Sequence, residues 1–164
     1  MSAAQAAGAR DVEIVAADPL GEDALTLLAE AVAEARRRYP EQFDPEAPAP
    51  TNAPVPSRGV FLLVRDGGAA VACGALRPLD AHCAEVRRMF VTARARRIGV
   101  ARRLLTELES QGRRLGFRAL RLETGVRQPE AIALYEAARF RRIPAYGQHI
   151  GDPHSVCFEK ALRS

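Results

Sequence analysis

The chain has 164 residues, of which 48% are hydrophobic, so it is long enough for one domain with a core and too apolar for general disorder. No apolar run approaches the roughly 18–20 residues that would cross a membrane. The formal charge of +4 is uneven, because residues 1–86 hold 7 Arg against 13 Asp and Glu while residues 87–142 hold 15 Arg against 5 Glu. With few aromatic residues and none interleaved with the arginines, this pattern suits an anionic cofactor and a cationic partner better than a nucleic-acid surface.

The chain is predicted to begin with a tail and a short strand. Residues 1–10 are rich in Ala and Gly and lack the basic start and apolar block of a signal peptide, so we expect a flexible tail there. A single domain is expected over residues 11–164, and Val12–Ala16, which alternates weakly, is its first predicted strand.

A helix and a proline-rich loop are predicted next. Gly21–Tyr39 places apolar residues on one helical stripe, with Asp18-Pro19 as a start signal and Pro40 as a stop signal. Residues 40–58 contain six of the eleven prolines, which predicts a loop without regular structure. A loop of this length in a small domain is usually functional or mobile.

The central part of the sequence reads as a hairpin followed by another strand. Gly59–Val64 and Ala69–Leu76 are apolar runs separated by Asp66-Gly67-Gly68, which is a strong hairpin signal. Glu85–Val91 is the next predicted strand. The remaining elements are a helix at Val100–Leu115 ended by Gly116, a strand at Ala119–Thr124, a helix at Pro129–Ala138 and a strand at His154–Leu162.

The turn before the second helix has the composition of an anion site. Arg96, Arg97 and Ile98 precede Gly99, and Val100 and Ala101 open the helix. A turn of small residues that leads into a helix presents several backbone N–H groups, and the helix dipole adds partial positive charge. The sequence therefore predicts a phosphate or pyrophosphate site here, with a plain strand-to-helix connection as the alternative.

Three cysteines bear on the cellular compartment. Cys73, Cys83 and Cys157 have no metal-ligand spacing, and an odd number without an export signal predicts free thiols in a reducing cytoplasm. The three histidines are not spaced as metal ligands either, so no metal site is expected. No apolar stripe demands a partner copy, which leaves a monomer or a homodimer open.

The order of elements and two motifs resemble the GNAT superfamily of N-acetyltransferases. The motifs are the R-x-x-G-x-A turn at Arg96–Ala101 and the segment Glu123-Thr124-Gly125 followed by Pro129-Glu130-Ala131-Ile132-Ala133-Leu134-Tyr135. The resemblance covers roughly residues 12–162. It implies the α/β (α+β) GNAT fold, a single mixed, mostly antiparallel, twisted sheet of about six to seven strands flanked by helices, with a splayed central strand pair.

The resemblance also implies acetyl-CoA as co-substrate and assigns residues to it. The CoA pyrophosphate is expected on the backbone and side chains of the turn, namely Arg96, Arg97, Ile98, Gly99, Val100, Ala101 and Arg102. Met89, Phe90 and Val91 are expected to run along the pantetheine arm through backbone hydrogen bonds. Tyr135 is expected to protonate the departing thiolate, the alternative being a ring that packs in the core.

Two carboxylates compete for the role of base, since an attacking amine must lose a proton. Glu85 opens the strand that leads to the turn, and Glu123 ends the neighbouring predicted strand. The alternative for both is a surface carboxylate paired with an arginine such as Arg87 or Arg121. Strand alternation places Glu85, Arg87, Met89 and Val91 on one face.

Other expectations concern the acceptor and the reaction. The segment Tyr146–Gly151, which contains His149, is interpreted either as a cap on the acceptor pocket or as exposed loop. Cys157 is a candidate for the acceptor cavity, but no activating base is evident beside it, which favours direct acetyl transfer in a ternary complex. The predicted acceptor is a primary amine of a small molecule or peptide. The alternatives are a non-catalytic acyl-CoA-binding regulatory module and, from the arginines, a nucleic-acid-associated protein.

Overall fold

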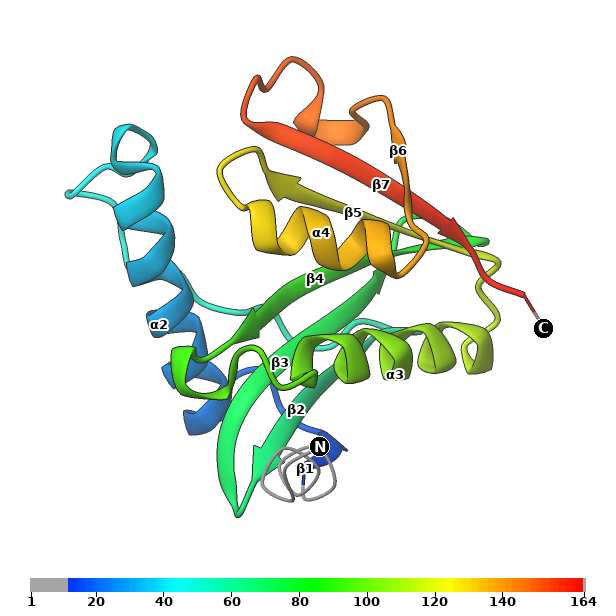
Figure 1. The fold of residues 1–164 in the computed structure, drawn as a ribbon, viewed down its shortest axis with the longest axis horizontal. Coiled ribbons are helices and arrows are strands. Elements are labelled where there is room, and N and C mark those ends of the chain that lie inside the picture. Colours follow the sequence, from blue (N-terminus) through cyan, green and yellow to red (C-terminus); the bar gives the residue numbers. More distant parts are fainter. Residues whose placement is uncertain (1–11, 164) are drawn as a thin grey trace.

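The computed structural model describes residues 12–163, and the tail predicted for residues 1–10 lies outside them. Seven strands form one sheet in the order β1-β2-β3-β4-β5-β7-β6 (Figure 1). Their bounds are Val12–Ala16 for β1, Val60–Asp66 for β2, Ala69–Pro78 for β3, Cys83–Val91 for β4, Ala119–Gly125 for β5, Arg141–Ile143 for β6 and Ser155–Ala161 for β7. All pairs are antiparallel except β4 with β5, so the expected mixed, mostly antiparallel sheet is confirmed.

Three α-helices accompany the sheet in the described residues: α2 at Glu22–Arg38, α3 at Val100–Arg114 and α4 at Pro129–Ala137. α2 begins with two acidic residues and ends with three arginines, and both sets complement the helix dipole. Gly116, with φ of 87°, follows the end of α3 as predicted. No helix among the described residues is long and apolar enough to span a bilayer.

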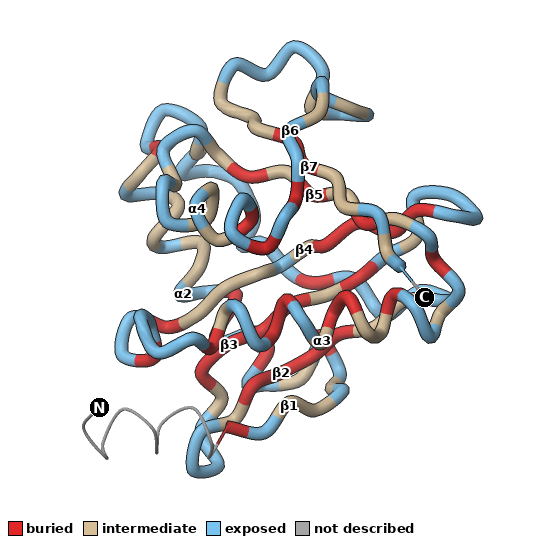
Figure 2. The backbone as a smooth tube through the Cα atoms, turned by 45° about the vertical axis from the view of Figure 1, so that its right-hand side comes forward, coloured by how far each residue is buried: buried red, intermediate tan, exposed pale blue. Residues whose placement is uncertain are grey.

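The sheet separates two hydrophobic cores. The smaller core holds Ala24 and Leu27 of α2 against Phe61, Leu63 and Cys73 of β2 and β3. The larger core lies on the opposite face and contains the buried leucines of α3, namely Leu104, Leu105 and Leu108. Figure 2 shows the buried residues concentrated along β2, β3 and α3. The helices α2 and α3 therefore cover opposite faces of the sheet.

The predicted hairpin and the predicted splay are both present. Gly67 and Gly68 have φ of 57° and 88° and join β2 to β3 in a two-residue turn, a conformation that glycine adopts without strain. β4 and β5 pair in parallel only from Cys83 to Glu85 and then separate (Figure 1). The backbone of β4 beyond Glu85 is consequently unpaired on its β5 side.

Two sequence-based expectations about strands are wrong. β6 was not foreseen, because three residues are too few to show a period of two. Glu85 and Met89 do not share a face, because a β-bulge at Arg88 shifts the register against β3. Met89 and Val91 instead pack on the larger core together with Val86.

Candidate functional site

A cleft of about 540 Å³ opens where β4 and β5 separate. Its walls come from α2, β4, β5, the start of α4 and the segment 149–154. All three residues predicted to take part in catalysis line it, namely Glu85, Glu123 and Tyr135. The sheet topology thus brings together side chains that are up to 50 residues apart in the sequence.

Glu85 is the most heavily engaged carboxylate of the cleft. Arg77 donates to Oε1 through Nε at 3.1 Å, and Arg87 donates to the same oxygen at 3.4 Å. The hydroxyl of Tyr146 donates to Oε2 at 2.6 Å. The Glu85 side chain is only 4% exposed, so these donors compensate a charge that burial would otherwise destabilise. The predicted pairing with an arginine is present, but the carboxylate is buried rather than on the surface.

His149 lies between the two cleft carboxylates. Its Nε2 is 4.0 Å from Glu85 Oε2, and its Nδ1 is 3.7 Å from Glu123 Oε2. Glu123, whose side chain is 29% exposed, also accepts a hydrogen bond from the Ser155 hydroxyl at 3.1 Å. Tyr146 packs edge-on against His149, with ring centroids 5.3 Å apart. The segment 146–151 therefore contributes His149 to the cleft, while Gly147, Gln148, Ile150 and Gly151 are exposed, so each interpretation of this segment describes part of it.

Tyr135 presents its ring to the core and its hydroxyl to the cleft wall. The ring contacts Phe140 and Phe158 edge-on or tilted, with centroids about 6 Å apart. Its hydroxyl has no hydrogen-bond partner among the described residues. Burial, and then the charge of Glu123, raise the pKa of this hydroxyl well above its ordinary value. Tyr135 therefore stays protonated at neutral pH, and its hydroxyl is free to donate a hydrogen bond, although the core-packing alternative also describes its ring.

The turn before α3 has the geometry of an anion site. Gly99 and Arg97 adopt left-handed backbone angles, with φ of 85° and 66°. The backbone N–H groups of residues 97–102 have no acceptor among the described residues. A Cβ built at Gly99 would meet nothing within 4 Å, so the space in front of these groups is open. A phosphate or pyrophosphate fits such a site.

One arginine of the turn is occupied within the protein. The Arg96 guanidinium donates to the Val91 carbonyl at 2.9 Å, forms an ion pair with Glu34 of α2, and lies over the Phe90 ring. Arg97 is exposed and free of these contacts. Arg96 thus joins α2, the end of β4 and the turn, which the sequence alone does not indicate.

The cysteines are poor nucleophiles here. Cys73, Cys83 and Cys157 are free and buried. Burial raises the pKa of Cys73 to about 12 and that of Cys83 to about 11, and it raises the pKa of Cys157 as well. A thiol in this state carries little thiolate at neutral pH, which disfavours an acyl-cysteine step. The described residues contain no group of three His, Cys, Asp or Glu side chains arranged to hold a metal ion.

The chain is similar to known acetyltransferases. The sequence model of the acetyltransferase (GNAT) family matches residues 28–140, which is more than half of the chain. The IAA acetyltransferase of Azospirillum brasilense is 42% identical over 103 residues, which are 62% of this chain and 67% of that protein.

Solved structures show the same fold. A protein from Klebsiella pneumoniae described as an acyl-CoA N-acyltransferase has a TM-score of 0.78 and 28% identity, over 93% of this chain and 98% of that one. A GNAT family acetyltransferase from Elizabethkingia anophelis with acetyl-CoA bound has a TM-score of 0.67 and 15% identity, over 93% of this chain and 99% of that one. At that identity the second likeness concerns the fold alone.

Proposed function

This chain belongs to the acetyltransferase (GNAT) family, and on that premise we propose that it transfers the acetyl group of acetyl-CoA directly to a primary amine of a small molecule or peptide. The observation that carries the proposal is the cleft itself, in which Glu85, Glu123 and Tyr135 lie beside the separated strands. The free N–H groups of the turn at one end of β4 suit the cofactor's phosphates.

The residues of the cofactor site would act through their backbone. The turn at residues 96–102 would bind the pyrophosphate, and the unpaired edge of β4 at Met89–Val91 would hold the pantetheine arm. Acetyl-CoA, when bound, supplies a thioester whose carbonyl is open to an amine. A backbone N–H of Met89–Val91 would polarise that carbonyl oxygen, and Tyr135, which keeps its proton, would donate to the departing sulfur.

Glu123 with His149 is better placed than Glu85 to take the proton of the amine. The lone pairs of Glu85 are already occupied by two guanidinium groups and the Tyr146 hydroxyl. Glu123 is more accessible from the cleft, and His149 lies 3.7 Å from it. Glu85 would then be a positioning residue that holds Tyr146 and His149, while Glu123 accepts the proton directly or through a water molecule.

Thiol release from acetyl-CoA tests the proposal against a panel of polyamines, amino acids, aminoglycosides and short peptides. With an accepted amine, Tyr135→Phe should lower kcat by about 10- to 100-fold, because a positioned acid contributes on that order or more. Its affinity for acetyl-CoA, measured by calorimetry, should remain. Tight acetyl-CoA binding with no release from any amine would instead support the regulatory module.

We further propose a cytoplasmic location and no nucleic-acid partner. The three free cysteines suit a reducing compartment. Many of the arginines that make residues 87–142 basic are paired within the protein, as Arg87 with Glu85 and Arg121 with Glu159 illustrate. Loss of RNA and DNA retention in a filter-binding titration at moderate salt would agree with this. The oligomeric state stays open between monomer and homodimer.

A further inference from the structure

Arg88 occupies an unusual position in the cleft. Among the described residues, four non-glycine residues have a positive φ, and Arg88, at 58°, is the one inside a strand. It forms the β-bulge of β4, opposite Gly74 of β3. Bulges next to functional sites often redirect a side chain that the regular strand would point elsewhere. The bulge directs Arg88 into the cleft, next to the strand residues proposed to hold the cofactor.

The guanidinium of Arg88 is held in place by an amide rather than by a carboxylate. Its Nε donates to Asn52 Oδ1 at 2.9 Å, and Asn52 Nδ2 in turn donates to the carbonyl of Pro19 at 2.9 Å. Asn52 is buried within the proline-rich loop. This hydrogen bond restrains Nε, and both terminal Nη groups have no acceptor among the described residues.

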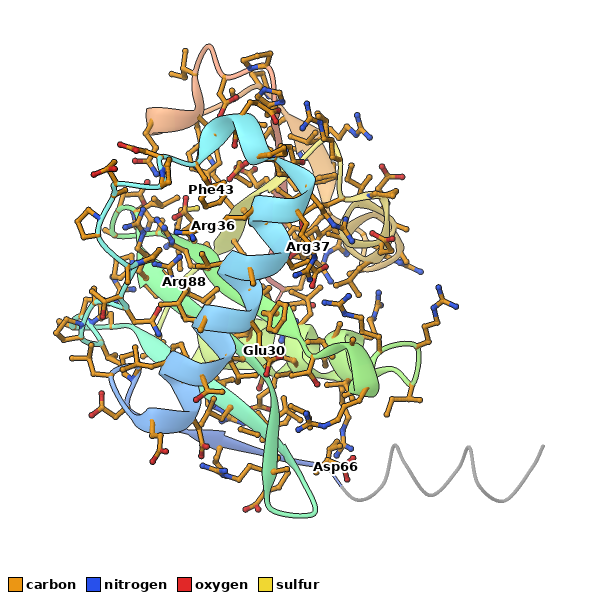
Figure 3. The ribbon with its side chains drawn as sticks, turned by 90° about the vertical axis from the view of Figure 1, so that its left-hand side faces the viewer. Glu30, Arg36, Arg37, Phe43, Asp66 and Arg88 are labelled. Atoms are coloured by element: carbon orange, nitrogen blue, oxygen red, sulfur yellow. The ribbon has the colours of Figure 1, made fainter. Side chains whose placement is uncertain are left out.

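Arg88 differs from the other two arginines of the cleft, which form ion pairs with carboxylates. Among the described residues, Arg38, Arg87 and Arg88 line the cleft. Arg38 forms ion pairs with Glu34 and Glu130, and Arg87 with Glu85, whereas Arg88 forms none with the residues that the structure describes. Burial, and then the charge of Arg87, lower the pKa of Arg88, although the side chain stays partly exposed to the cleft. Figure 3 shows Arg88 to one side of α2, and Phe43, which also lines the cleft, lies above it in that view.

We propose that Arg88 binds a carboxylate of the acceptor, so that the substrate is an amino acid or a similar small molecule that carries both an amine and a carboxylate. A guanidinium that is held at Nε and keeps its terminal nitrogens free matches the two oxygens of a carboxylate. The carboxylate would be held at the bulge and the amine directed toward Glu123 and His149. This inference rests on the proposed function and names its substrate class.

Matched acceptors separate this inference from the proposed function. The wild type is assayed with L-phenylalanine and L-phenylalaninamide, with L-methionine and L-methioninamide, and with L-glutamine and L-isoglutamine. The last pair distinguishes an α-carboxylate from a side-chain carboxylate. The amine of each α-carboxamide is less basic and more often neutral, so without carboxylate recognition the α-carboxamides would react faster. We expect the wild type to have the higher kcat/KM for the acceptor with the α-carboxylate in each pair.

Substitutions then identify Arg88 as the cause. Arg88→Met should lower kcat/KM for the carboxylates about tenfold or more, mainly through KM, and change the values for the α-carboxamides by less than about threefold. The kcat/KM of Arg88→Lys for the carboxylates should lie between those of the wild type and Arg88→Met. Lysine keeps the positive charge and loses the forked donors of the guanidinium. Arg37→Met, an exposed arginine of α2 outside the cleft, should leave both values unchanged. The affinity of Arg88→Met for the product N-acetyl-L-phenylalanine, measured by calorimetry, should fall by a similar factor.

The outcomes are distinct. Turnover of amines without preference for carboxylates, or equal losses on both acceptor classes in Arg88→Met, would overturn the role of Arg88 and leave the proposed function standing. Equal losses together with a lowered Tm would mean that Arg88 only ties the proline-rich loop to β4. No thiol release from these acceptors or from the wider amine panel would refute the proposed function, and this inference with it.

Discussion

Replacing Tyr146 with phenylalanine removes one hydroxyl from the most highly connected group of the cleft. That hydroxyl donates to Glu85 Oε2 at 2.6 Å, while the two arginines on Glu85 bind mainly the other oxygen. The phenylalanine ring can keep the edge contact with His149 and the position under Arg121. The substitution therefore changes one hydrogen bond and little of the packing.

The expected cost follows from burial and charge. A hydrogen bond to a charged group contributes about 1.5–3 kcal/mol, and more is at stake when its partner is left unsatisfied away from water. Since Glu85 is almost completely buried, we expect a loss in the upper part of that range. For a domain of this size, where 1 kcal/mol shifts Tm by about 2–4 °C, a loss of about 2.2–3 kcal/mol should lower Tm by about 4–12 °C.

A double-mutant cycle checks the reasoning. The free energies of unfolding of the wild type, Tyr146→Phe, Glu85→Gln and the double variant are measured by urea denaturation at pH 7. Most of the Tyr146→Phe cost should disappear when Glu85 is already replaced, because the two side chains share one interaction. A cost below about 0.5 kcal/mol, or the same cost in both backgrounds, would refute the assigned hydrogen bond.

Two further substitutions test packing and ionisation. Gly125→Ala places a Cβ 2.1 Å from the Tyr39 hydroxyl, which accepts from the Arg127 N–H, so we expect a loss of about 1–3 kcal/mol on urea denaturation, smaller in a Tyr39→Phe background. Burial raises the pKa of Cys73 from 9.0 to about 12, so above pH 9 the unfolded chain loses a proton that the folded one keeps. The free energy of unfolding should therefore fall with rising pH by up to about 1.4 kcal/mol per unit, and Cys73→Ala should reduce that slope; an unchanged slope would contradict the assignment.

Strong local signals account for most of the fold that the sequence predicts. The Asp66-Gly67-Gly68 turn forms because two adjacent positive φ angles suit glycine, and Pro40 stops α2 because proline cannot continue a helix. β6 has no comparable signal, since its three residues are a strand only through pairing with β7. The register shift in β4 also could not be predicted, because arginine is not a residue type that indicates a left-handed backbone.

The residues of the candidate site also differ in whether a local sequence signal points to them. Glu123 and Tyr135 lie in a motif and Glu85 on the strand that leads to the turn, so the sequence points to all three, and all three line the cleft. Tyr146 and His149 were left between two interpretations, since their partners lie far away in the sequence and only the fold brings them together. A lone histidine or tyrosine in a loop has no spacing from which a distant carboxylate can be inferred.

The bulge at Arg88 connects the two halves of the site. Before it, β4 directs Glu85 and Arg87 toward the cleft; after it, Met89 and Val91 turn to the larger core, and the backbone edge is left for a ligand. A regular strand would keep Met89 on the face of Glu85 and would bury Arg88 or point it away. The shift of one residue thus separates the part of β4 proposed to face the acceptor from the part proposed to hold the cofactor through its backbone. If the acceptor binds in this cleft as proposed, Arg88 lines its path, and the charge of that side chain should then influence the choice of acceptor.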